Sequence, residues 1–314
     1  MNVGVLTSGG DAPGMNPCVA QVVRGCWERG HAVLGYRQGF FGVRDDDCIP
    51  LTPKDVQGWY KLGGTELRTG RMPELTETEW QARLAGRLAE RGIGGLIVIG
   101  GDGSFRGASA LHRADDSLNV IGIPATIDNN IFGSDYTLGY DTALNKQMAY
   151  IDDISASAMS LPGRVFFVET LGAWDGYLPH SSVLMGMADF SVLVERPLTN
   201  EEICARIEAF LRRGERDYVL VTFAEGSQQM FEAAACVRAQ LGLNVKCNLL
   251  GYQQRGGVPT ALDRLHAAGF AKYAVDALDE GVRNKYLVYR EGRYDYLDIA
   301  CAERKKVFDR FEIA

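Results

Sequence analysis

The chain of 314 residues is 46% hydrophobic and 23% charged, which suits a well-packed protein of two α/β lobes and excludes a disordered one. Its formal net charge of −7 argues against nucleic acid or an anionic membrane as the main partner, although local cations can still hold an anionic substrate. The cysteines form no Cys-x-x-Cys pair, the first residues do not resemble a secretory signal, and no apolar run approaches the about 20 residues that cross a bilayer, so we expect a cytoplasmic protein with reduced thiols.

Short apolar runs predict strands that follow one another along the chain, with helical stretches between them. Their Val, Ile and Leu content is nearly continuous, as expected for strands that are buried on both faces of a parallel sheet. The strands are expected over residues 2–7, 32–36, 95–99, 119–123, 164–169, 218–223 and 248–251. The alternation of strands and helices predicts an α/β fold with mainly parallel sheets.

One helix can be placed in detail, over residues 201–213. Its apolar residues, such as Ile203 and Ile207, fall on one face at helical spacing. Asn200 is expected to cap its amino end, and Gly214 is expected to stop its carboxyl end.

Two glycine-rich turns come directly after expected strands, over residues 7–11 and 100–104. Ligands of a doubly wound sheet bind at the carboxyl ends of its strands, and glycines there let the backbone and the following helix N-terminus approach a polyphosphate. A carboxylate beside phosphate is favourable only with a divalent cation between them, so Asp102 is a candidate magnesium ligand. Each turn is equally compatible with a plain tight βα connection, and neither matches a P-loop or a complete Gly-x-Gly-x-x-Gly.

The segment over residues 124–130 places Asp128 at the end of another expected strand, beside Thr126 and two amides. Phosphoryl transfer needs positioning, charge neutralisation and one base near the attacking hydroxyl. Asp128 has the chemistry of that base. An aspartate at a strand end can also be a helix N-cap, and taken alone this second interpretation stays open.

Taken together, these segments and others in the same order resemble the phosphofructokinase A family of 6-phosphofructokinases. The matching segments are residues 4–16, 63–65, 71–74, 99–104, 124–130, 133–139 and 251–257. The expected fold is therefore two Rossmann-like lobes with mainly parallel sheets. The nucleotide-binding lobe is expected over residues 1–138 plus 254–303 and the sugar-phosphate lobe over residues 139–253 plus 304–314, with chain crossings near Tyr140 and Tyr252.

The resemblance implies roles on the donor side of the reaction. Asp128 corresponds to the catalytic base, Thr126 helps to place the transferring group, Arg71 bridges the donor and acceptor phosphates, and Asp102 is the magnesium ligand. The residues expected at the nucleotide are Gly10, Arg71, Gly101, Asp102, Gly103, Ser104 and Gly107. Pyrophosphate-using members carry Asp where this chain has Gly103 and Lys where it has Ala125, so the resemblance implies ATP as the phosphoryl donor, with Mg²⁺.

The resemblance also implies an acceptor site for a sugar phosphate. Its expected residues are Thr126, Asp128, Asn130, Arg164, Leu171, Gly172, Glu225, Lys246, Tyr252 and Arg255. Arg164 and Lys246 reach a neighbouring subunit's site in this family, which implies a homodimer or homotetramer with shared active sites.

The chain departs from the family mostly on this acceptor side. Asn130 stands where the family has Asp, Ala173 and Lys246 stand where it has Arg, and Tyr252 stands where it has His. Arg106 is a candidate to replace the cation that Ala173 lacks. At the effector pocket of the family, an alanine replaces a usual arginine at position 20, which implies weak or absent regulation by nucleotide diphosphates.

The predicted function is ATP-dependent phosphorylation of fructose 6-phosphate to fructose 1,6-bisphosphate. One alternative is a kinase of the same fold redirected to another sugar or polyol. A second alternative is a nucleotide-binding regulatory subunit without catalysis, against which the retention of Asp102, Thr126 and Asp128 argues, because a plain binder needs no base.

Overall fold

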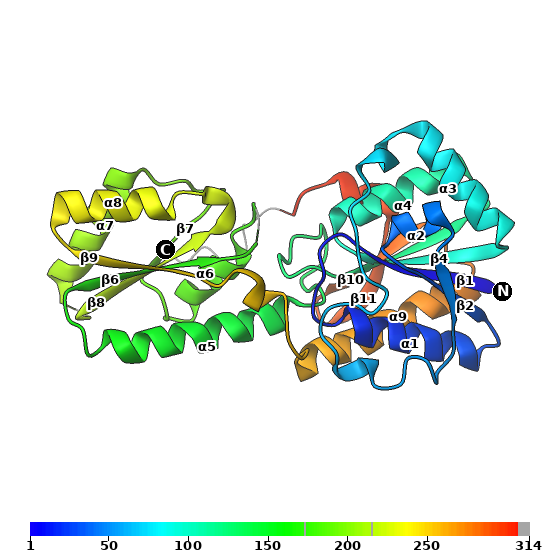
Figure 1. Ribbon diagram of the computed structural model, residues 1–314, viewed down its shortest axis with the longest axis horizontal. Coiled ribbons are helices and arrows are strands. Elements are labelled where there is room, and N and C mark those ends of the chain that lie inside the picture. Colours follow the sequence, from blue (N-terminus) through cyan, green and yellow to red (C-terminus); the bar gives the residue numbers. More distant parts are fainter. Residues whose placement is uncertain (173, 215, 307–314) are drawn as a thin grey trace. The chain divides into compact units, whose positions relative to one another are not determined.

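The computed structural model describes residues 1–306 except 173 and 215, and the chain divides into two compact units. Unit 1 comprises Met1–Thr142 and Arg255–Lys306, and the described part of unit 2 lies within Ala143–Gln254. In Figure 1 the blue, cyan, orange and red parts of the chain build unit 1, and the green to yellow part builds unit 2.

Unit 1 contains a seven-stranded sheet of order β11-β10-β5-β4-β1-β2-β3. Its strands are β1 (Asn2–Ser8), β2 (Ala32–Tyr36), β3 (Cys48–Leu51), β4 (Ile93–Gly100), β5 (Asn119–Pro124), β10 (Lys285–Arg290) and β11 (Arg293–Asp298). The central strands are parallel, whereas β3 and β11 close the two edges in antiparallel pairing. This arrangement brings the carboxyl ends of β1, β4 and β5 to one edge of the sheet.

Helices cover both faces of this sheet (Figure 1). They are α1 (Met15–Glu28), α2 (Phe40–Asp45), α3 (Thr78–Glu90), α4 (Asp102–Ala114) and α9 (Ala261–Asp279). The helices α1 and α9 contact each other in one layer, and α3 contacts both α2 and α4 in the other. The result is the three-layer arrangement that buries a parallel sheet on both sides.

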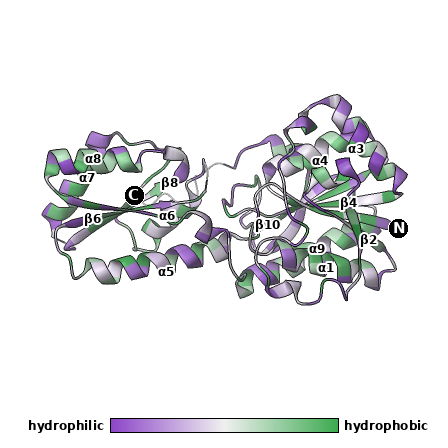
Figure 2. Cartoon of the chain, viewed as in Figure 1, coloured by the Kyte–Doolittle hydropathy of each residue, from purple (hydrophilic) through white to green (hydrophobic). Residues whose placement is uncertain are grey.

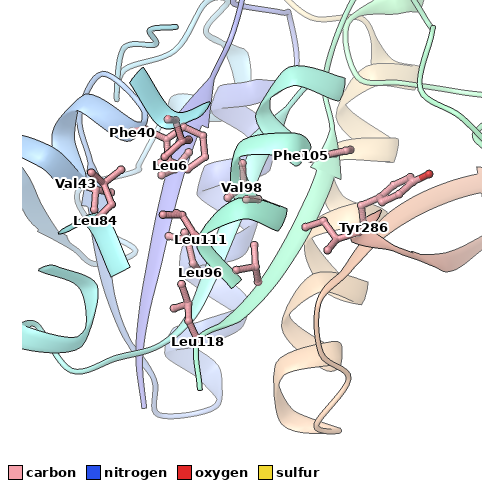
Figure 3. Packing of buried hydrophobic residues seen from close by; sticks show 14 of the residues in the cluster. Leu6, Phe40, Val43, Leu84, Leu96, Val98, Phe105, Leu111, Leu118 and Tyr286 are labelled. Atoms are coloured by element: carbon pink, nitrogen blue, oxygen red, sulfur yellow. The ribbon is translucent and has the colours of Figure 1, made fainter. Parts of the chain in front are cut away.

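The core under α2, α3 and α4 is continuous from the sheet to the helices. Figure 3 shows Leu96 and Val98 of β4 beside Phe105 and Leu111 of α4. The ring of Phe105 stacks on Tyr286 of β10 with 5.1 Å between ring centroids. This packing holds the first turn of α4 at a fixed place beyond the end of β4.

Unit 2 contains a four-stranded, fully parallel sheet of order β7-β8-β6-β9. Its strands are β6 (Arg164–Thr170), β7 (Phe190–Val192), β8 (Tyr218–Ala224) and β9 (Asn244–Leu249), and its helices are α6 (Tyr177–Leu184), α7 (Asn200–Arg213) and α8 (Met230–Leu241). The helix α5 (Tyr140–Ala158) begins in unit 1 and continues in unit 2. Phe167 of β6 and Phe223 of β8 lie 4.7 Å apart, centroid to centroid, in the core.

The hydropathy of the chain follows this burial. Figure 2 shows that central strands such as β4 are largely hydrophobic, whereas outer helices such as α3 carry both kinds of residue. Within the described part of the chain, no helix combines the length and the apolar run that crossing a membrane requires.

Six of the expected strands are confirmed, each within two residues of the observed ends. The strand expected over residues 248–251 is placed too far along the chain, because β9 covers Asn244–Leu249 and a 3-10 turn occupies Gly251–Gln254. In this edge strand Val245 is buried and Lys246 is exposed, and the segment that carried the prediction overlaps the strand only at Asn248 and Leu249. The strands β3, β7, β10 and β11 were not predicted.

The helix expected over residues 201–213 is confirmed as α7, and Gly214 ends it with a φ of 65°. The N-cap is Thr199 rather than Asn200. The Thr199 hydroxyl accepts the Glu202 N–H, and the Glu202 carboxylate accepts the Thr199 N–H, at 3.2 and 2.7 Å. This reciprocal capping box satisfies two helix-end donors that a cap at the next residue would leave open.

The division of the chain differs from the expected lobes at three places. The two crossings lie between Thr142 and Ala143 and between Gln254 and Arg255. Residues 304–306, expected in the sugar-phosphate lobe, belong to unit 1, where Lys306 Nζ donates to the carbonyl of Asn129 at 2.7 Å. Residues 307–314 lie outside the described residues.

Candidate active site

A cavity of about 640 Å³ opens in unit 1 at the carboxyl ends of its central strands. Its lining includes the expected residues Gly10, Arg71, Gly101, Asp102, Gly103, Ser104, Gly107, Thr126, Asp128, Asn130 and Arg255. The strand register explains the convergence, because Ser8 of β1 pairs with Gly100 of β4, and Gly100 pairs with Pro124 of β5. Three loops that are far apart in the sequence therefore start side by side.

The glycine turn after β4 requires a residue without a Cβ atom. A Cβ on Gly100 would lie 2.5 Å from the carbonyl oxygen of Ser8 and 2.5 Å from the hydroxyl of Ser104. The turn after β1 is equally constrained, since Gly9 has a φ of 91° and donates its N–H to the carbonyl of Gly70 at 3.2 Å. Both turns hold the backbone close to the cavity, as binding a polyphosphate demands.

Arg255 lies beside the turn that follows β1. Its guanidinium Nη1 is 3.5 Å from the point where a Cβ of Gly10 would stand. Arg255 was expected at the sugar phosphate, and the structure places it in unit 1 among the residues that line the cavity. It adds a cation beside a turn that faces the proposed phosphates.

Asp102 is the first residue of α4 and has two partners close by in the sequence. Its Oδ1 accepts the Gly103 N–H at 2.6 Å, and its Oδ2 accepts from Arg106 Nη1 at 2.7 Å. Each carboxylate oxygen has two acceptor sites, so these bonds leave capacity for a metal. Among the described residues no three His, Cys, Asp or Glu side chains gather into a metal site. The single carboxylate of Asp102 is the kind of ligand that Mg²⁺ uses together with substrate phosphates and water.

Hydrogen bonds within the segment and from Thr137 and Leu138 hold the loop that carries Asp128. Asp128 donates its N–H to the Thr126 hydroxyl at 3.2 Å, and the Thr137 hydroxyl donates to the Thr126 carbonyl at 2.6 Å. Leu138 donates its N–H to the carbonyl of Pro124 at 3.0 Å. Asp128 itself is half-buried in a turn. The next helix, α5, begins at Tyr140, so the N-cap interpretation of Asp128 does not apply.

The far end of the cavity was not predicted apart from Gly107. It is lined by apolar Phe40, Met72, Leu75 and Ala110 and by polar Thr76, Gln81, Arg113 and Glu303. A Cβ on Gly107 would lie 2.5 Å from Leu75 Cδ2 and 3.3 Å from Phe40 Cε2, so this glycine lets α4 approach the opposite wall. The residues come from separate segments and share no motif, which is why sequence reasoning missed them.

The remaining expected residues lie in unit 2. Leu171 and Gly172 follow β6, and Glu225 follows β8 at the same edge of the sheet, since Thr170 pairs with Ala224. The Leu171 N–H donates to Gln254 Oε1 at 2.7 Å. Ala173 lies outside the described residues.

Two expected acceptor residues lie away from that edge. Arg164 is the first residue of β6, at the opposite edge of the sheet from Glu225. Lys246 lies within β9, opposite Phe166 of β6. Tyr252, by contrast, lies in the 3-10 turn after β9, at the same edge as Leu171 because β9 is parallel to β6, and 78% of its surface is exposed. Unit 2 alone therefore does not gather Arg164 and Glu225 into one site.

The carboxyl group of Glu169, near the end of β6, has a shifted pKa. Burial, and secondly the charge of Glu225, raise the pKa of Glu169 above its ordinary value. The negative charge of Glu225 disfavours the ionised form of Glu169.

Comparison with known proteins decides the family. A model of the phosphofructokinase family matches residues 2–278. The ATP-dependent 6-phosphofructokinase 1 of Thermus thermophilus is 39% identical over 311 residues, which cover 98% of this chain and 96% of that protein. The chain belongs to the phosphofructokinase family. The ATP-dependent 6-phosphofructokinase of Aquifex aeolicus is likewise 35% identical over 313 residues, with 99% and 97% covered.

Solved phosphofructokinase structures share the fold. The Pichia pastoris phosphofructokinase in the T-state has a TM-score of 0.88 and 30% identity, and the match covers 96% of this chain and 37% of that longer one. A pyrophosphate-dependent phosphofructokinase from Marinobacter aquaeolei has a TM-score of 0.85 at 20% identity, which shows the fold alone. The resemblance seen in the motifs and the predicted α/β fold with mainly parallel sheets are both confirmed.

Proposed function

We propose that this phosphofructokinase-family chain transfers the γ-phosphoryl group of ATP to fructose 6-phosphate, forming fructose 1,6-bisphosphate and ADP. The observation that carries the proposal is the meeting of Gly10, Asp102 and Asp128 at one cavity, each at the carboxyl end of a different parallel strand. The relatives from Thermus thermophilus and Aquifex aeolicus are named ATP-dependent 6-phosphofructokinases, which supports the same reaction.

In the proposed mechanism this chain positions groups and balances charge. Asp128 accepts the proton of the attacking hydroxyl, and Thr126 helps to place the transferring group. Arg71 and the two glycine turns stabilise the charge on the equatorial oxygens. Asp102 would hold Mg²⁺ together with the donor phosphates, and the bound ion supplies positive charge that neutralises them.

Two features support ATP as the donor. The cavity volume of about 640 Å³ lies within the range of about 300–1,000 Å³ of small-molecule sites, and its far end offers apolar walls to a base and a ribose. A Cβ on Gly103 would have Arg106 Nη2 as its nearest neighbour, at 3.7 Å, so the backbone there leaves room for an α-phosphate.

The acceptor side of the proposal needs more than one copy of the chain. Glu225, Leu171 and Gly172 of unit 2 would hold the sugar, and Asn130 and Arg255 of unit 1 remain candidates for contacts with the acceptor. Arg164, Lys246 and Tyr252 would serve the sugar phosphate, the two cations doing so from a neighbouring copy in a homodimer or homotetramer. The two alternatives, a redirected acceptor and a non-catalytic subunit, have no observation in their favour. The proposal places the enzyme in the cytoplasm, as its cysteine usage predicts.

An ADP-release screen tests the proposal. Purified protein is assayed with ATP or pyrophosphate as the donor and with fructose 6-phosphate, other sugar phosphates and free polyols as acceptors. Turnover dominated by ATP and fructose 6-phosphate supports the proposal. A preference for another acceptor or for pyrophosphate, or ATP binding without any transfer, contradicts it.

A further inference from the structure

The cavity contains an ion pair that has no part in the mechanism above. Arg106 Nη1 lies 2.7 Å from Asp102 Oδ2 on the first turns of α4, and the two side chains are 51% and 49% exposed. Both line the cavity. Arg106 Nη2 is also 3.7 Å from the position that a Cβ of Gly103 would occupy. The guanidinium therefore lies beside the glycine turn at the start of α4, where the donor phosphates are proposed to bind.

The ion pair between Arg106 and Asp102 is weak enough for Arg106 to leave Asp102 for another anion. Exposed ion pairs four residues apart on a helix are among the weakest in proteins, because water screens both charges. A polyphosphate offers several oxygens with the spacing that a guanidinium fork binds in a bidentate manner. A phosphate that arrives at Gly103 therefore competes strongly with Asp102 for Arg106.

The charges of the cavity make such an exchange useful. Its charged lining residues are four arginines and four carboxylates, namely Arg71, Arg106, Arg113, Arg255, Asp11, Asp102, Asp128 and Glu303. Without Arg106 the Asp102 carboxylate would stand unscreened at the helix N-terminus and repel an incoming anion. With Arg106 still bound to it, Asp102 would be a weaker ligand for a divalent cation.

We propose that Arg106 contacts the phosphates of the donor nucleotide and that, in doing so, it leaves Asp102 available to the metal. The inference rests on the proposed function, since it takes the cavity to be the ATP site. In the absence of nucleotide Arg106 screens Asp102. When ATP binds, Arg106 moves onto phosphate oxygens and the metal replaces it at the carboxylate. Arg106 and the metal are therefore alternative partners of the same aspartate.

Binding measurements on Arg106→Met test this exchange without any acceptor or turnover. The dissociation constant of ATP is measured by calorimetry in EDTA and again in saturating Mg²⁺. In EDTA the variant should bind ATP about tenfold or more weakly, because a charge-assisted contact is lost. In Mg²⁺ the loss should shrink severalfold, because the metal meets no competitor at Asp102. Arg106→Lys should fall between the two proteins, since it keeps the charge and loses the fork.

Arg83→Met is the matched control. Arg83 pairs with Glu79 four residues before it on α3 at 3.7 Å, outside the residues that line the cavity, so this variant should bind ATP like the wild type. Equal ATP affinity of Arg106→Met and the wild type in EDTA would overturn the phosphate contact. An equal loss in EDTA and in Mg²⁺ would overturn the exchange. If Arg106→Met shows the predicted losses of ATP affinity but the wild type transfers no phosphoryl group, the proposed function is overturned and the inference stands.

Discussion

At the scale of single residues, the proposed chemistry depends on Asp128. Replacement by Asn keeps the size of the side chain and removes its ability to accept the hydroxyl proton. We expect Asp128→Asn to lower kcat by about two to four orders of magnitude, the usual contribution of a general base. The dissociation constant of ATP should stay near the wild-type value. Steady-state kinetics and calorimetry check the two halves of this prediction.

The control for that variant is Asp116→Asn, which makes the same chemical change at an exposed position between α4 and β5. It should leave kcat unchanged. Full activity of Asp128→Asn would remove Asp128 from the role of base. A loss of ATP binding equal to the loss of kcat would make Asp128 a binding residue instead.

A second residue, Glu169, predicts a pH dependence of stability. Burial and the neighbouring Glu225 raise its pKa in the folded protein. A carboxyl group with a raised folded pKa contributes its full stability below its unfolded pKa of about 4.3, and this stability is lost as the pH rises through the folded value. The wild type therefore carries a penalty at neutral pH that Glu169→Gln removes.

We expect the free energy of unfolding of Glu169→Gln, relative to the wild type, to increase between pH 4 and pH 7. Urea unfolding at several pH values measures it. The gain should be a fraction of a kcal/mol, because solvent screens a carboxyl that is only partly buried. Glu232→Gln, on the exposed side of α8, makes the same chemical change and is the control. A difference for Glu169→Gln that stays flat or declines with pH would contradict the account.

Residues differ in how far the sequence alone can place them. The turn at Gly100 and the segment at Asp128 were predictable, because strand, glycine and carboxylate lie next to one another in the chain. The far wall of the cavity was not, since Phe40, Gln81 and Glu303 meet there only through tertiary packing. The pairing of Arg106 with Asp102 was also missed, although a spacing of four residues on a helix is a local signal.

At the scale of secondary structure, the amino end of α7 yields a stability prediction. Thr199→Ala removes the hydroxyl that accepts the Glu202 N–H at 3.2 Å. The free energy of unfolding of unit 2 should decrease by about 1 kcal/mol, the typical cost of losing a cap. Urea unfolding followed by circular dichroism measures the change. Thr199→Ser keeps the hydroxyl and should recover most of the loss; if both variants equal the wild type, the capping box contributes nothing.

The success of the strand predictions mostly followed burial, and the exception is β10, which was missed although Tyr286, Leu287 and Val288 are buried. The strands β1, β2, β4, β5, β6 and β8 were found because their apolar residues form nearly unbroken runs. The strands β9 and β11 are edge strands with exposed or half-buried residues in their patterns, so a search for continuous apolar runs misplaced the first and missed the second. β3 and β7 have only four and three residues, too few for a periodic signal.

At the scale of the whole molecule, the sheet of unit 2 predicts shared active sites. The strand β6 has seven residues, which span roughly 20 Å at about 3.3 Å per residue. Arg164 at its first residue and Glu225 beyond the last pair of β6 and β8 are therefore too far apart for one sugar phosphate. If both bind it, the two residues must come from different copies, and light scattering should give a dimer or a tetramer.

Mixing two inactive variants tests that sharing. Arg164→Ala and Asp128→Asn are each nearly inactive by this account. Hybrid oligomers contain one site with both native residues, so mixed and refolded protein should recover about a quarter of the wild-type activity, the fraction expected from random pairing of shared sites. No recovery in hybrids that light scattering confirms as oligomers, or a fully active monomer, would contradict the sharing.

The most direct test of the central claim is a ³¹P NMR time course of the wild-type protein with ATP, Mg²⁺ and fructose 6-phosphate. The account predicts that ATP is converted to ADP in step with a second sugar phosphate signal, that of fructose 1,6-bisphosphate, with no inorganic phosphate formed. ATP that stays intact, or that yields inorganic phosphate while the fructose 6-phosphate signal is unchanged, would contradict it.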